Sequence, residues 1–122
     1  ICVDAGDVKR PIIEKLEELG IPFVDVGMGI ELVGDTLLGM LRVTTSTADM
    51  RDHVRDKKRI SFSGGHDDEY KQNIQIADLN ALNAALAVIK WKKLFGVYLD
   101  LDREHFSIYV LDGNKILNED NS

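Results

Sequence analysis

Cysteine, proline and aromatic residues are all scarce in this sequence. Its 122 residues include one cysteine (Cys2), two prolines and 7% aromatic residues. A single cysteine cannot form an internal disulfide, so a disulfide-stabilised scaffold is excluded and the usage is typical of a reducing compartment. We therefore expect a cytoplasmic protein, in which Cys2 lies in an apolar run and serves as a core residue.

Long hydrophobic runs and a basic surface are also lacking. No apolar stretch approaches the roughly 20 residues that a membrane-spanning helix needs, and no signal peptide is recognisable. The net charge is −6, whereas a nucleic-acid surface requires clustered cations. The densest basic stretch, residues 51–59, is interrupted by aspartates and is typical of a solvated face. We expect no membrane partner and no nucleic-acid partner.

What the sequence does contain is enough apolar material for the core of one domain. Hydrophobic residues make up 44% of the chain and charged residues 30%, which is ordinary for a globular protein. The first residues, "ICVD", have the pattern of the end of a buried strand, and no methionine precedes them. We therefore expect residues 1–122 to be a single partial domain taken from a longer protein.

A strand–helix–strand unit is predicted for the first 28 residues. Residues 5–20 have helical spacing, with an apolar stripe of Val8, Ile12, Leu16 and Leu19 and with Ile13 beside it. Residues 21–28 form a short apolar strand. Because this unit has the length of a βαβ crossover, the two strands should run parallel.

The remainder of the chain predicts antiparallel strands and one long helix. Two strand-like runs are separated by the turn at Gly34, and a second turn at 112–114 predicts a terminal hairpin. Residues 48–70 are polar and rich in glycine, which indicates a long, mobile crossover loop with one helical turn near 49–56.

The long helix is predicted between residues 72 and 96. Its apolar stripe contains Ile76, Leu79, Leu82, Leu86 and Ile89. Three asparagines, Asn73, Asn80 and Asn83, are spaced so that at least two should face this stripe or its alanine-rich flank, where buried amides need partners.

Glycines at 27, 29 and 34 suggest a phosphate-binding loop at first sight. Such a loop requires glycines between a strand and a helix, whereas strand-like residues follow these glycines and the spacing is wrong. We expect these glycines to form a bend between a parallel strand and its antiparallel continuation. The acidic run 66–69 is an equally poor metal site, because adjacent residues rarely converge on one ion.

Asp4 is the best candidate for chemistry. It follows the first predicted strand, and ligands of open α/β sheets bind at the carboxyl ends of strands. Lys9 and Arg10 follow in the first turns of the helix, so an acid for Mg²⁺ and two cations for phosphate charge would lie together. The alternative, in which Asp4 only caps the following turn, remains open.

The segment "CVDAGDVKRPIIEKLEELGIPFVDVGMGIELVGDTLLGMLRV", followed by "NAALAVIKWKKLFG" and the terminal hairpin, resembles the second half of the ThiF/MoeB/HesA family. These enzymes are adenylyltransferases related to ubiquitin-activating enzymes. The similarity covers nearly all of the chain except residues 48–70, and its most specific part is the strand–Asp4–helix–"GIP"–strand block.

The resemblance implies a Rossmann-like α/β fold that binds ATP and Mg²⁺ and adenylates the C-terminal carboxylate of a ubiquitin-like or sulfur-carrier protein. It implies that Asp4, with Lys9 and Arg10 after it, contacts Mg-ATP, and that Gly27 and Gly29 line the groove for the carrier's tail. We also expect a homodimer, because a partial sheet leaves an unpaired edge and an uncovered apolar face.

The sequence departs from the family in several places. Ala5 stands where the family usually has asparagine, and Lys9 where it usually has arginine. The family's glycine-rich phosphate loop belongs to the first half, which these residues do not supply, so we expect this half to be inactive alone. With Cys2 as the only thiol, neither the paired zinc-binding cysteines nor a thioester-forming cysteine of the crossover loop is present.

Two other classes of function remain possible from the residues. A Rossmann module for NAD or FAD would share the fold, with a G-x-G-x-x-G loop upstream. A non-catalytic module would use the sheet and the helix stripe of Leu79, Leu82, Leu86 and Ile89 for dimerisation.

Overall fold

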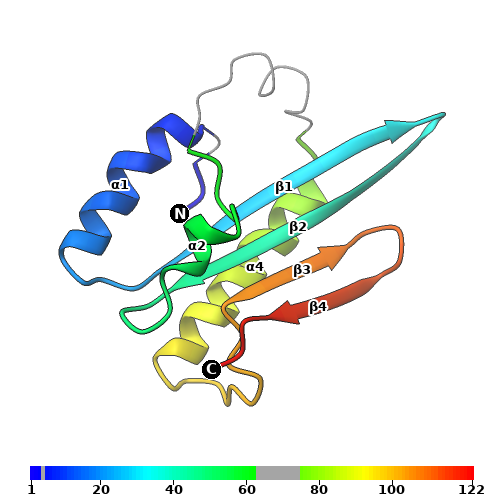
Figure 1. The fold of residues 1–122 in the computed structure, drawn as a ribbon. Coiled ribbons are helices and arrows are strands. Elements are labelled where there is room, and N and C mark those ends of the chain that lie inside the picture. Colours follow the sequence, from blue (N-terminus) through cyan, green and yellow to red (C-terminus); the bar gives the residue numbers. More distant parts are fainter. Residues whose placement is uncertain (4, 63–74) are drawn as a thin grey trace.

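The computed structural model describes residues 1–3, 5–62 and 75–122. Its elements follow the order α1 (Gly6–Glu18), β1 (Phe23–Val33), β2 (Thr36–Ser46), α2 (His53–Asp56), α4 (Ala77–Leu94), β3 (Phe106–Val110) and β4 (Lys115–Glu119). The strands form a four-stranded antiparallel sheet in the order β1-β2-β3-β4 (Figure 1). The chain is thus an α/β protein, and both predicted hairpins are confirmed.

The start of the chain pairs with β1 in the parallel sense. The Ile1 nitrogen donates to Val24 O at 2.6 Å, and the Val26 nitrogen donates to Ile1 O at 3.2 Å. Two such bonds flanking Asp25 on one strand are the pattern of a parallel pair. Residues 1–3 form no regular strand, however, and all strand pairs of the described sheet are antiparallel, so the predicted parallel crossover is not confirmed.

The glycines of β1 lie within a continuous strand. β1 pairs with β2 over its whole length, from Phe23 opposite Ser46 to Val33 opposite Thr36. The expected bend at Gly27 and Gly29 is therefore wrong. These residues keep the extended backbone because the long hairpin turns only at Gly34, whose φ of 61° suits glycine.

Helix α1 presents a different face to the protein from the one its apolar spacing predicts. Ile13 is fully buried and Lys9 is buried with it, whereas Val8, Ile12 and Leu19 are exposed. The predicted stripe is therefore wrong for Val8, Ile12 and Leu19, whereas Leu16 packs against the core beside Ile13. The buried face includes Lys9 because of an ion pair described below.

The two faces of the sheet are covered differently. Helix α4 lies behind β1 and β2 in Figure 1, where Leu79 packs with Ile30 and Leu41. On the other face, α1, α2 and the segment after α2 enclose only the end where β1 begins, around Phe23 and Ile13. No other described element covers the rest of that second face.

The predicted stripe of α4 is only partly buried. Leu79 is buried and Leu82 is half-buried, but Ile89 is 41% exposed. Of the three asparagines, Asn83 is buried and Asn80 is exposed, while Asn73 lies outside the described residues.

The structure also bears on Cys2, on the predicted loop 48–70 and on membrane-spanning helices. Cys2 is exposed, so its assignment to the core is wrong. The helical turn predicted near 49–56 is α2, but the mobility of 48–70 stays a prediction because residues 63–70 lie outside the described part. Among the described residues, no helix has both the length and the apolar character needed to cross a membrane.

Candidate functional site

The open part of the sheet is the candidate functional surface. Side chains alternate between the two faces of a strand, and Met28, Ile30, Leu41 and Tyr109 point to α4. Their neighbours therefore point to the opposite side. In the strand register these form two rows, which we together call the open sheet face. The first row contains Gly27, Arg42, Ile108 and Leu117, and the second contains Gly29, Met40, Val110 and Lys115.

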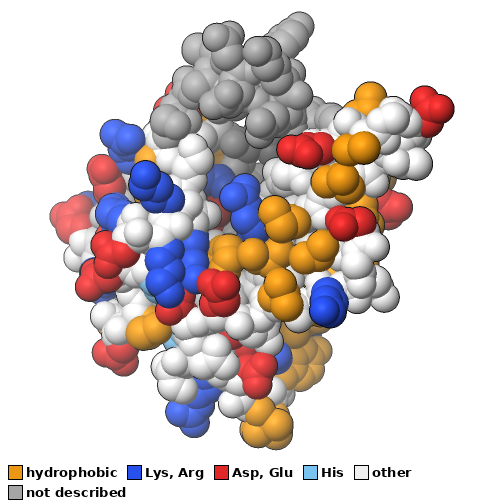
Figure 2. All heavy atoms as spheres, turned by 45° about the vertical axis from the view of Figure 1, so that its right-hand side comes forward, with side chains coloured by type: hydrophobic (Ala, Val, Ile, Leu, Met, Phe, Trp, Pro, Cys, Tyr) orange, Lys and Arg blue, Asp and Glu red, His pale blue; other side chains and the backbone are white. Residues whose placement is uncertain are grey.

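This face is apolar and accessible. Met40 is 45% and Leu117 49% exposed, and Ile108 and Val110 are half-buried. Figure 2 shows hydrophobic side chains gathered at the centre of the molecule and along the β1–β2 hairpin. An apolar sheet surface of this kind is typical of a binding site for another polypeptide.

Gly27 and Gly29, the predicted lining of a tail groove, both lie on the open sheet face. A Cβ on Gly29 would meet no atom of the described residues within 4 Å, so none of them fills the space above this residue. A Cβ on Gly27 would lie 3.1 Å from Arg42 Nη2. Glycine at 27 gives the guanidinium room to lie across the strand, and at 29 it leaves the sheet flat.

Arg42 is a half-buried cation of this surface, where Lys115 is an exposed one, and sequence reasoning missed it. It stands directly opposite Gly27 in the register and is half-buried. Within residues 1–3, 5–62 and 75–122 its guanidinium forms neither a hydrogen bond nor an ion pair, although arginine carries five donors. A single arginine in a strand matches no sequence motif. The one signal that could have indicated Arg42 is its position opposite Gly27 in the hairpin register.

Lys9 is held inside the protein next to the open sheet face. Its Nζ lies 3.0 Å from both carboxylate oxygens of Asp25 and donates to Val26 O at 3.1 Å. Both side chains are less than 10% exposed. Burial raises the pKa of the Asp25 carboxyl, while the charge and hydrogen bond of Lys9 oppose that rise. The ammonium of Lys9 is thus engaged within the fold.

The described part of the structure does not bring the other predicted nucleotide contacts together. Arg10 is exposed and donates from Nη2 to Phe62 O at 3.1 Å. Asp4 lies outside the described residues. In the described part of the chain, no group of three or more His, Cys, Asp and Glu residues could hold a metal ion.

Helix α4 holds the strand beneath the open sheet face from behind. The Asn83 side chain donates from Nδ2 to Gly27 O at 3.0 Å. This hydrogen bond from the helix helps to fix the position of the strand carbonyl. It also confirms, for Asn83, the expectation that a buried helix amide has a partner. This bond supports Gly27, and hence Arg42, from the covered side.

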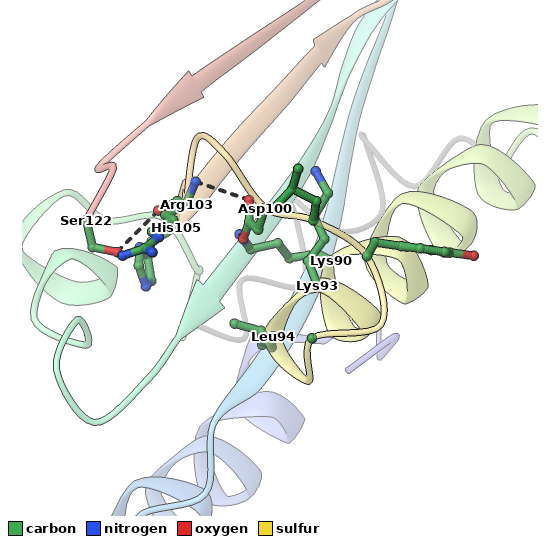
Figure 3. A pocket seen from close by; sticks show the side chains of 10 residues that line it. Lys90, Lys93, Leu94, Asp100, Arg103, His105 and Ser122 are labelled. Carbon is green, nitrogen blue, oxygen red and sulfur yellow. Dashed lines mark hydrogen bonds and ion pairs between the residues drawn. The ribbon is translucent and has the colours of Figure 1, made fainter.

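A cavity of about 560 Å³ opens beside the end of α4 (Figure 3). Lys90 reaches into it and pairs with Asp100 at 2.8 Å and with Glu104 at 3.6 Å. Burial would raise the pKa of Asp100, but the hydrogen bond and charge of Lys90 outweigh burial and lower it. Asp100 also accepts from the Arg103 nitrogen at 3.1 Å. These groups hold the loop after α4 against the helix, which is a structural role.

A second ionic cluster lies near the end of the chain. Arg59 is buried, pairs with Glu119 at 2.6 Å and also with Asp120, and its guanidinium stacks 4.1 Å from the centre of the Phe106 ring. Lys57 pairs with Asp120 at 2.8 Å. The interpretation of 51–59 as a solvated face is therefore wrong for Arg59, because its acidic partners come from a distant part of the sequence.

Comparison of the chain with protein-family models, with curated proteins and with solved structures found no match. The resemblance to the ThiF/MoeB/HesA family therefore stays a prediction, together with the cofactors and carrier it implies.

Proposed function

We propose that this chain forms the carrier-binding half of an ATP-dependent adenylyltransferase of the ThiF/MoeB/HesA kind. Its substrate would be the C-terminal carboxylate of a ubiquitin-like or sulfur-carrier protein. The observation that carries this proposal is the open sheet face, where a largely apolar surface holds the Arg42 guanidinium. Its charge acts on the buried Asp25, but among the described residues it forms no hydrogen bond or ion pair.

The shape of the open sheet face suits an extended peptide. Gly27 and Gly29 leave the β1 side flat, and Met40, Val110 and Ile108 supply apolar contacts beside it. An extended tail places alternate side chains on one side, so every second residue could pack on these groups. A small residue at the end of the tail would fit next to the glycines.

Arg42 supplies recognition of the tail's end. A guanidinium matches a carboxylate with two parallel hydrogen bonds, and the apolar surroundings strengthen such a bond. Arg42 would thus orient the carboxylate oxygens at one end of the tail. Because adenylation removes the carboxylate charge, the same contact would weaken after the reaction and favour release from Arg42.

The described residues do not by themselves fit Mg-ATP. The Lys9 ammonium is buried against Asp25 and Val26, and only the exposed Arg10 offers a cation at the start of α1. The roles of Asp4, Lys9 and Arg10 toward ATP and Mg²⁺ remain predictions of the resemblance, and we derive no chemical step from them.

ATP–pyrophosphate exchange by the natural protein that contains these residues tests the proposed activity. Exchange should require a carrier protein with a free C-terminal carboxylate. Gly29→Val should lower exchange at least about tenfold, because its side chain would project from the flat surface where the tail is proposed to lie. Gly34→Asn, at the far hairpin turn, should leave exchange unchanged because asparagine tolerates a positive φ.

Absence of exchange with every ubiquitin-like or sulfur-carrier protein tried would refute the adenylyltransferase. If the protein binds the carrier but catalyses no exchange, it is a non-catalytic binding module. Full exchange by the Gly29→Val variant would show that the open sheet face is not the tail site.

A further inference from the structure

The side of α4 that points away from the sheet is apolar. Its outward residues, which we call the outer α4 stripe, follow helical spacing: Ala77, Ala81, Ala84, Val88, Trp91 and Phe95. All are exposed, and the three largest, Val88, Trp91 and Phe95, are 52%, 54% and 62% exposed. Trp91 and Phe95 contact each other with ring centres 5.0 Å apart.

Packing on the sheet does not explain this pattern. The side of α4 that faces the sheet contains Leu79 but also the buried polar residues Asn83 and Lys90. A surface helix normally places its polar residues outward, whereas two of the three buried residues of α4 are polar. Among the described elements, none covers the outer α4 stripe (Figure 1). An apolar surface of this size marks an interaction site.

The order of small and large residues along the stripe is complementary to itself. Ala77, Ala81 and Ala84 lie in the first half, and Phe95, Trp91 and Val88 lie equally far beyond position 86. We propose that a second copy of this chain covers the outer α4 stripe, as an antiparallel helix pair with its two-fold axis near position 86. Each large side chain then faces an alanine of the other copy, as an isologous interface requires.

Charges on the flank of the stripe agree with this arrangement. Asp78 stands at the start of α4 and Lys92 near its end, and at about 100° per residue they lie on the same side of the helix. In the antiparallel pair, Asp78 of each copy lies near Lys92 of the other, so the contact occurs twice. The opposed helix dipoles are also favourable in this orientation.

This interface is separate from the proposed tail site. The outer α4 stripe and the open sheet face lie on opposite sides of the sheet, so a helix pair leaves Arg42 and its surroundings accessible. The inference therefore does not depend on the adenylyltransferase proposal, and either can fail alone.

Sedimentation equilibrium of the chain tests this inference. At about 100 μM the protein should have twice its mass of 13.7 kDa. Val88→Glu, which puts a charge next to the two-fold axis, should raise the dimer dissociation constant at least about 100-fold. Leu32→Glu is the matched control, because Leu32 is 66% exposed at the far end of β1 and its variant should remain a dimer.

Charge reversal tests the antiparallel register. Asp78→Lys and Lys92→Glu should each weaken the dimer about tenfold, since a surface ion pair is lost twice, and the double variant should regain most of the affinity. Unfolding by urea should confirm that each variant folds. A monomeric wild type, a dimer unaffected by Val88→Glu, or a double variant no tighter than its singles would overturn the proposal.

Discussion

Lys9 lies where a helix that packs on a sheet usually presents an apolar side chain. With Asp25 it forms an ion pair that is almost completely removed from solvent. Removing one member leaves the other as a buried charge without a partner. We therefore expect Asp25→Ala to lower the free energy of unfolding by about 3–5 kcal/mol. Urea denaturation measures this change.

The double variant Lys9→Met, Asp25→Leu provides the control for that experiment. It removes both charges and keeps apolar volume, so its stability should lie much closer to wild type. Additive losses in the double variant would show that the two side chains act independently, and a loss below about 1 kcal/mol for Asp25→Ala would show that the pair is solvated.

His53 gives a pH dependence at the scale of a single residue. Its Nε2 lies 2.9 Å from Thr45 O and its Nδ1 lies 2.9 Å from Arg59 Nη1. A carbonyl only accepts and a guanidinium only donates, so the ring is neutral with its proton on Nε2. Burial lowers the pKa of His53 below its ordinary value of 6.5, and the charge of Arg59 lowers it further, although the bond to Thr45 opposes this.

The unfolded state therefore binds a proton at His53 before the folded state does. The stability that the neutral ring contributes is complete above pH 6.5 and is lost as the pH falls through 6.5 toward the lower pKa of the folded state. Urea denaturation between pH 7.5 and about 5.5 should show this loss, and His53→Gln should show a smaller one. Equal slopes in the two proteins would contradict the assignment.

At the scale of elements, the β1–β2 hairpin contains one glycine that should tolerate a side chain and one that should not. A Cβ on Gly39 would lie 2.4 Å from Gly29 O, a backbone atom that cannot move aside, whereas a Cβ on Gly29 would meet nothing. We expect Gly39→Ala to cost about 1–3 kcal/mol and Gly29→Ala to cost almost nothing. Thermal unfolding of both variants decides this, and equal melting temperatures would contradict the register.

The sequence predicts some elements well because their signals are local. Gly34 and the turn at 112–114 set both hairpins, and the alanine-rich run near Ala84 predicts α4 correctly. The inward face of α1 could not be predicted, since Lys9 turns inward to meet Asp25, a partner in another element. The same applies to Arg59, whose acidic partners stand near the end of the chain.

At the scale of the whole molecule, Arg59 joins the segment after α2 to the last strand. It pairs with Glu119 and Asp120 and also contacts His53. Arg59→Met should leave these groups without their cation and lower the free energy of unfolding by about 2–4 kcal/mol. Lys57→Met, at an exposed pair with Asp120, should cost less than about 1 kcal/mol. Similar losses of unfolding free energy in the two variants would show that the buried ion pairs of Arg59 contribute no more than an exposed pair.

The candidate site could be predicted only in part. The resemblance pointed to Gly27 and Gly29, and both lie on the open sheet face. Arg42 became visible only when the register placed it over Gly27, because cross-strand neighbours are far apart in sequence. Asp4 lies outside the described residues, so its role stays a prediction.

Binding of a short peptide tests the central claim, which is recognition of an extended tail by Arg42 on the open sheet face. The probe is a fluorescein-labelled octapeptide with leucine at alternate positions and a C-terminal glycine, prepared as free acid and as amide. Fluorescence anisotropy should show at least about tenfold tighter binding of the acid, as expected for a charged hydrogen bond. Arg42→Gln should abolish this preference while leaving binding of the amide unchanged. Equal affinities of the two peptides for the wild type, or an undiminished preference in Arg42→Gln, would contradict the claim.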